Sequence, residues 1–196
     1  MMFKEILGLV AVAMTFIAFL PYIRSIMQGK TKPHVFSWVI WGLTTFVIFL
    51  AQLSDGGGAG AWAIGVSGLI TMYVAILAYQ KHADTLITKV DWVFFIAALA
   101  AIPLWIITED PLWTVIILTM IDVFGFAPTF RKSFYHPFDE QLGFYVLMAS
   151  RNVVVVLALE YYSVITALFP ALTGLLAFVF ILMVMIRRKQ MANWVL

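Results

Sequence analysis

Two charged residues, Asp122 and Arg151, lie deep inside apolar segments of this chain of 196 residues. Counted from segment ends near residues 133 and 139, at 1.5 Å per helical residue, they lie roughly 16 and 18 Å deep on the same side. A charge at such depth in a membrane is costly unless it is paired or hydrated, and it usually faces a bundle interior or an aqueous pathway. We therefore expect Asp122 and Arg151 to interact, either in a substrate or proton pathway or as a structural ion pair.

The composition places these charges in a membrane protein. The chain is 64% hydrophobic and 11% charged, whereas soluble domains are about 45–50% apolar and about 25% charged. This excludes a water-soluble globule and a disordered tail, and a net charge of +2 is too small to indicate a nucleic-acid partner. A membrane helix takes roughly 20 residues, so the chain has room for about seven spans and none for a soluble catalytic domain.

Apolar runs bounded by charges or by Gly, Pro or Asp predict seven transmembrane helices in an all-α fold. The expected ranges are 5–25, 34–53, 60–80, 90–107, 111–130, 139–158 and 161–186. Because most connections are short, we expect consecutive helices to be antiparallel neighbours. Most basic residues fall on the side that holds the C-terminus. By the positive-inside rule this side is cytoplasmic, which places the N-terminus outside and predicts a multi-pass cell-membrane protein.

An offset of 107 residues aligns the first and fifth expected helices. The types that recur in register are Phe, Pro and Arg, at Phe19 and Phe126, Pro21 and Pro128, and Arg24 and Arg131. After one gap, Ser67-Gly68-Leu69 aligns with Thr173-Gly174-Leu175. Two three-helix units can be parallel only if one helix is inserted between them. We expect a first repeat at residues 1–86, a linker helix at 87–108 and a second repeat at 109–196.

The same offset gives the charged residues polar counterparts in the first unit. The aligned pairs are Thr15 with Asp122, Thr44 with Arg151, and Thr45 with Asn152. The expected site is therefore polar in both units and charged in one. This pattern favours an asymmetric solute that bears a charge, or proton coupling through Asp122, and we take all six residues as candidates for the substrate or proton pathway.

Aromatic and proline residues add further candidates. Trp38 and Trp41 are one turn apart, and Trp38 aligns with Tyr145, so their flat faces could enclose a ring-bearing or polyhydroxy solute, with simple packing as the alternative. Pro21 and Pro128 lie about one turn from the cytoplasmic ends of equivalent helices. Interior proline kinks a helix, so both are candidate hinges, and static kinks are the alternative.

The segment Ala18-Phe19-Leu20-Pro21-Tyr22, followed by the basic loop Gln28-Gly29-Lys30-Thr31-Lys32-Pro33, resembles the first helix and Lys-Thr-Lys loop of the PQ-loop and SWEET (MtN3) superfamily. The resemblance covers most of the chain. It implies a seven-helix carrier that moves a small polar metabolite by alternating access through a cavity between the two units. In it, Ser67 and Thr173 stand where sugar carriers place an Asn, which adds both to the candidate pathway.

A receptor is the alternative function. The same architecture resembles the KDEL receptor, so the chain could instead bind a ligand, or act as an assembly partner, without net transport. No Ser/His/Asp or paired-carboxylate pattern indicates an enzyme, and with no Cys and no metal spacing among His34, His82 and His136 we expect no metal and no cofactor. The expected partners are a small polar solute and the lipid bilayer, and the sequence allows a homo-oligomer.

Overall fold

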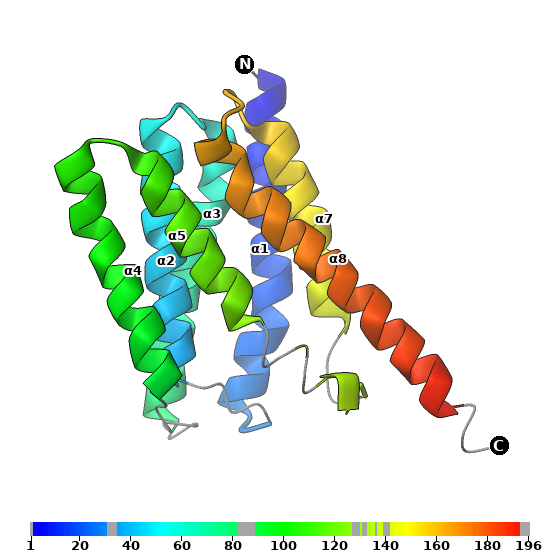
Figure 1. Cartoon of the computed structure of the whole chain (residues 1–196). Helices are drawn as coiled ribbons and strands as arrows, with labels where there is room; N and C mark the ends of the chain where they lie inside the picture. The colour runs from blue at the N-terminus through cyan, green and yellow to red at the C-terminus, as the bar shows by residue number, and fades with distance from the viewer. Residues whose placement is uncertain are drawn as a thin grey trace.

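The computed structural model describes residues 2–30, 35–81, 89–126, 130, 133–135, 137–138 and 142–192. Within these ranges the chain is helical and contains no strand. Its long helices are α1 (Met2–Met27), α2 (Val35–Ser54), α3 (Ala59–Gln80), α4 (Lys89–Thr108), α5 (Pro111–Gly125), α7 (Leu142–Ala158) and α8 (Val164–Ala192). They run along one another as a bundle, in which α1 begins at one end and α8 finishes at the other (Figure 1).

The length and composition of the helices are those of a membrane protein. α1, α3 and α8 are each long and apolar enough to cross a membrane. The shorter apolar stretches are Trp38–Ser54, Phe95–Thr108, Pro111–Gly125 and Leu142–Ala158. Large apolar side chains such as Ile17, Ile76 and Leu175 are more than half exposed, which suits a surface in contact with lipid rather than water.

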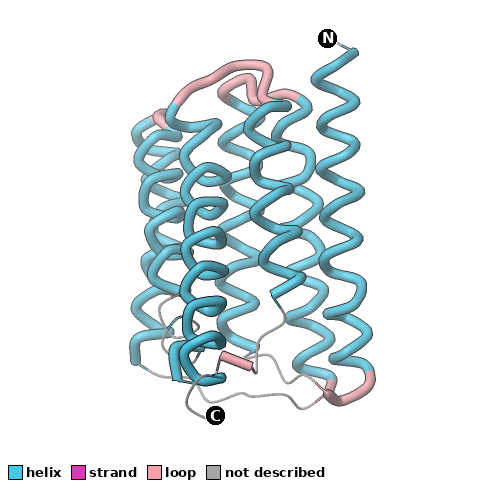
Figure 2. The backbone as a smooth tube through the Cα atoms, turned by 90° about the vertical axis from the view of Figure 1, so that its right-hand side faces the viewer, coloured by secondary structure: helices cyan, strands magenta, loops and turns pink. Residues whose placement is uncertain are grey.

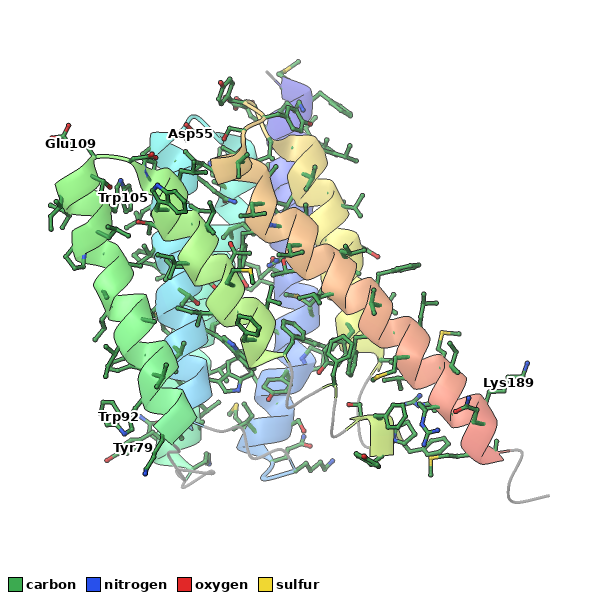
Figure 3. The ribbon with its side chains drawn as sticks, viewed as in Figure 1. Asp55, Tyr79, Trp92, Trp105, Glu109 and Lys189 are labelled. Carbon is green, nitrogen blue, oxygen red and sulfur yellow. The ribbon has the colours of Figure 1, made fainter. Side chains whose placement is uncertain are left out.

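Charged and aromatic side chains mark the two ends of the bundle. Figure 3 shows Asp55 and Glu109 at the end where α1 begins, and Lys189 at the opposite end. Trp105 lies near the first end and Trp92 near the second. Such belts of amphipathic rings are typical of membrane–water interfaces.

The helices pack in two groups of three. In the first group α3 packs against both α1 and α2, and in the second α8 packs against both α5 and α7. The groups meet where α1 packs against α7 and where α2 packs against α5. α4 lies outside both groups and packs against α5 and α2.

The expectation that consecutive helices are always neighbours is wrong. α2 packs against α3, α4 against α5 and α7 against α8, and each of these pairs is joined by a short turn, at the upper end of the bundle in Figure 1. The consecutive pairs α1 and α2, α3 and α4, and α5 and α7 are not among the substantial packed pairs of the described helices. Longer connections join these pairs, and even seven extended residues reach more than about 20 Å, enough to pass a helix of about 10 Å diameter.

Helix ends follow local hydrogen bonds more closely than hydropathy. Asp110 caps α5 by accepting a hydrogen bond from Leu112 N at 2.8 Å, with Pro111 in the first turn. The helix ends at Gly125, not at the expected residue 130. α8 starts at Val164 rather than residue 161, because Ser163 and Thr166 exchange backbone-to-side-chain hydrogen bonds of 2.9 and 3.2 Å.

Within each helix group, a glycine lets two helices pack closely. A Cβ atom on Gly68 of α3 would lie 3.0 Å from the backbone N of Phe46 in α2. A Cβ atom on Gly174 of α8 would lie 3.0 Å from Cβ of Asn152 in α7. Small residues at such positions let membrane helices approach backbone to backbone. The close approach places Asn152 directly against α8, next to the polar residues described below.

Candidate functional site: a buried polar layer between the helix groups

Asp122 lies at the contact between α5 and α2. Its side chain is 5% exposed, and the fully buried Thr44 of α2 donates a hydrogen bond from Oγ1 to Asp122 Oδ1 at 2.7 Å. Phe126, the residue that follows the last residue of α5, contacts Trp41 of α2 with ring centroids 6.4 Å apart. The face of α5 that carries Asp122 is therefore turned toward the first helix group rather than toward lipid.

Arg151 belongs to a second hydrogen-bonded set, at the contact between α7 and α8. Arg151 Nη2 donates to Asn152 Oδ1 at 2.6 Å, and Asn152 Nδ2 donates to Thr173 Oγ1 at 3.0 Å. The Thr173 hydroxyl in turn donates to the carbonyl of Phe169 at 2.6 Å. Arg151 is only 2% exposed, so this neutral chain of donors and acceptors holds a fully enclosed guanidinium group.

The expected interaction between Asp122 and Arg151 is not present in the described part of the chain. Asp122 bonds to Thr44 on α2, whereas Arg151 bonds to Asn152 on its own helix. Arg151 Nε and Nη1 have no hydrogen-bond partner there. The physical reason is the packing order, because α5 packs against α2, α4 and α8, and α7 packs against α1, α3 and α8. Similar depth on consecutive helices does not bring two side chains together when those helices are not packed neighbours.

The remaining polar candidates are also buried. Thr15 of α1 is fully buried and donates to the carbonyl of Ala11 at 2.9 Å. Thr45 and Ser67 are buried too, and the carbonyl of Ser67 accepts a hydrogen bond from Thr71 at 2.7 Å. Every polar residue predicted for the pathway is thus buried. Hydrogen bonds form two separate sets, Asp122 with Thr44 and Arg151 with Asn152 and Thr173, and the bonds of Thr15 and Ser67 join neither set.

An aromatic layer lies next to the polar layer, toward the end of the bundle where α1 finishes. Trp38 stacks on Tyr22 with centroids 5.1 Å apart and planes at 25°. Phe144 of α7 contacts Tyr22 at 5.9 Å and its neighbour Tyr145 at 5.5 Å. Tyr145 then contacts Phe180 of α8 at 4.2 Å. The predicted rings Trp38 and Tyr145 are therefore linked through Tyr22 and Phe144, and sequence reasoning missed Phe144.

Trp41 closes this aromatic layer against α5. A Cβ atom on Gly125 would lie 2.5 Å from the indole Nε1 of Trp41, so the ring packs directly on the backbone at the end of α5. Trp41 also contacts Trp38 edge to face at 5.8 Å. A side chain at position 125 would displace this ring.

Of the two candidate hinges, Pro21 lies within the described residues and Pro128 does not. Pro21 lies inside α1, six residues before its end at Met27. The residue that follows it, Tyr22, is the one stacked on Trp38. Pro128 lies outside the described residues, and α5 ends before it, at Gly125.

The opposite end of the bundle is tied across the two groups by hydrogen bonds. Ser163 Oγ donates to Asp55 Oδ2, and Gln52 Nε2 donates to the carbonyl of Thr166 at 2.8 Å. The backbone N of Glu160 donates to the carbonyl of Gly57 at 3.3 Å. We call these three contacts the outer ties. Sequence reasoning missed them, although Gln52, an amide within an apolar helix and fully buried in the structure, was a readable signal.

The comparisons with known proteins add no assignment to this geometry. No family model, no curated protein and no solved structure matches the chain. Among the residues placed by the structure, no group of three or more His, Cys, Asp or Glu side chains could hold a metal ion.

Proposed function

We propose that this chain is a transporter of a small polar metabolite that works by alternating access in the cell membrane. The observation that carries the proposal is the buried polar layer. Asp122 and Arg151, with opposite formal charges, are enclosed at contacts between helices rather than facing lipid. Intramembrane ionisable residues in such positions typically line substrate or ion pathways.

The proposed architecture is seven spans in a three-plus-one-plus-three repeat of PQ-loop or SWEET type, with a cytoplasmic C-terminus. It is supported by the pattern of helix contacts. If α1, α2 and α3 are exchanged with α5, α7 and α8, every contact within and between the two groups maps onto another contact that is present. The linker α4 stands outside this exchange, as an inverting helix would. The matching glycine contacts of α3 with α2 and of α8 with α7 support the same repeat.

Alternating access requires that each end of the bundle can open in turn. The outer ties hold one end through three hydrogen bonds across the groups. At the other end the groups meet through ring contacts, such as Phe19 with Phe144 at 5.8 Å. In the proposed cycle these two sets of contacts break in turn, and a hinge at Pro21 lets the inner part of α1 move while its outer part stays packed.

Asp122 is the proposed coupling residue. Its contact with Thr44 joins α5 of one group to α2 of the other. Gain or loss of a proton at this carboxyl would change that contact, and with it the relative stability of the two conformations. A proton gradient could then drive uptake of the solute across the membrane.

The runner-up function is a seven-helix receptor or assembly partner, which would bind a ligand from one side only. The outer ties are the observation that favours it, because a receptor could keep that end closed permanently. The proposed transporter must open it. Neither function uses a catalytic residue, a metal or a cofactor.

Uptake into proteoliposomes tests the proposal. Purified protein is reconstituted and offered a panel of labelled metabolites with and without a pH gradient, and wild type is compared with Asp122→Asn. We expect gradient-driven accumulation of at least one solute by wild type and loss of the gradient effect in Asp122→Asn. Binding without flux would favour the receptor, and full gradient-driven uptake by Asp122→Asn would exclude coupling through Asp122.

A further inference from the structure

The guanidinium group of Arg151 is enclosed without a counter-charge in the described part of the chain. Its side chain is 2% exposed, its one hydrogen bond goes to the neutral Asn152 side chain, and Nε and Nη1 have no partner. A buried charge without a partner is strongly unfavourable unless another group pairs with it. The arrangement therefore lacks an anion rather than a donor.

The position of Arg151 on α7 shows which surface it occupies. Phe144 lies two helical turns before Arg151, on the same face of the helix, and contacts both Phe19 and Tyr22 of α1. Asn152 is rotated away from this face and packs against Gly174 of α8. Arg151 thus lies on the face of α7 that is turned toward α1, at the contact between the two helix groups.

Neighbouring residues fix the guanidinium group in place. Asn152 accepts from Arg151 and donates to Thr173, which is anchored on the carbonyl of Phe169. This support leaves two of the three guanidinium nitrogens available. A purely structural arginine at a helix contact would have its donors satisfied by the partner helix, and the buried acid of the polar layer, Asp122, is bonded to Thr44 instead.

We propose that Arg151 binds an oxyanion of the transported solute, either a carboxylate or a phosphate group. A planar guanidinium group matches both oxyanions, with charge-assisted hydrogen bonds that are stronger than neutral ones. A neutral solute would leave the buried charge unpaired, so the site discriminates against it. The inference rests on the proposed transport function, because it takes the anion to be the transported solute. Binding of an anion at Arg151 can nevertheless be tested without transport.

The test compares three compounds that share a three-carbon skeleton: glycerate, glycerol 3-phosphate and glycerol. Their binding to the purified full-length protein is measured by calorimetry and by the shift of its melting temperature. We expect glycerate, glycerol 3-phosphate or both to bind and glycerol not to bind. The anion that binds with the higher affinity shows whether the site prefers a carboxylate or a phosphate group. Equal binding of glycerol, or no binding of either anion, would overturn the proposal.

Variants connect the binding to Arg151. Arg151→Gln should lower the affinity for the anion by roughly tenfold or more, as expected for the loss of a charged hydrogen-bond donor. Arg24→Gln, which removes an exposed arginine of α1, should leave binding unchanged. If Arg151→Gln does not yield folded protein, Arg151→Lys keeps the charge but not the planar fork and should also bind more weakly. Unchanged affinity in the folded Arg151 variant would overturn the proposal.

The outcome is separable from that of the proposed function. Anion binding that depends on Arg151, together with no uptake of any solute, would contradict transport and leave this site intact. Uptake of a neutral solute that is insensitive to Arg151→Gln would contradict this site and leave transport intact.

Discussion

A buried carboxyl group needs hydrogen-bond donors, and the donor that Asp122 receives from another helix is the Thr44 hydroxyl. This single contact joins the two helix groups at the polar layer. Thr45, the next residue, is buried as well, but the threonine hydroxyl that bonds to Asp122 is that of Thr44. The two threonines therefore offer a matched pair of variants.

Thr44→Val should destabilise the protein, because it leaves a buried acceptor unsatisfied at a cost of about 1–3 kcal/mol. Thr45→Val should cost less. Thermal unfolding in detergent measures both, and the comparison is repeated with Asp122→Leu as the background. There the penalty of Thr44→Val should shrink, because the acceptor is gone. An equal penalty in both backgrounds would show that the hydrogen bond does not contribute.

The sequence identified the residues of this layer better than their partners. A charge within an apolar segment is conspicuous, and the repeat offset pointed to Thr15, Thr44 and Asn152. The pairing of Asp122 with Thr44 depends on which helices pack together, and hydropathy does not encode that. Phe144, which connects Tyr22 to Tyr145, was missed because one aromatic residue among many in an apolar helix carries no distinguishing signal.

At the scale of the helices, the apolar runs predicted where the helices lie but not their neighbours. Short turns did fix neighbours, as for α4 and α5, which are joined by Glu109 and Asp110. The α1–α2 connection is longer and left the order of packing open. Helix ends were misplaced where the apolar pattern continues past a local stop, as at Gly125 of α5, or where a helix extends beyond the basic residues Arg187 to Lys189, as α8 does.

Pro21 is the proposed hinge of α1. Pro21→Ala restores a backbone N–H inside the helix and removes the clash with the preceding turn. We expect it to leave the protein folded and to slow uptake on the order of tenfold, which corresponds to about 1.4 kcal/mol in the barrier. Pro103→Ala in α4 also changes a proline inside a helix, but α4 lies outside the two helix groups, so this variant serves as the control. Equal effects of the two variants on the uptake rate would argue against a hinge at Pro21.

At the scale of the whole molecule, two helix groups contact each other at both ends of the bundle. Figure 2, turned by 90° from Figure 1, shows the helices running along one another, with loops at the end of the bundle where α1 begins. Two of the outer ties join the α2–α3 turn to the α7–α8 turn, and the third joins Gln52 of α2 to Thr166 of α8. Ring contacts join the groups at the other end. Transport by alternating access requires the outer ties to break in each cycle, whereas a one-sided receptor can keep them.

A reversible cross-link across the outer ties tests this requirement most directly. The chain has no cysteine, so the double substitution Asp55→Cys and Ser163→Cys introduces a single possible disulfide in each molecule. Uptake of the solute found by the proteoliposome panel is measured after oxidation and again after reduction, with each single variant as a control. We predict that oxidation abolishes uptake and that reduction restores it. Undiminished uptake by fully cross-linked protein would contradict alternating access.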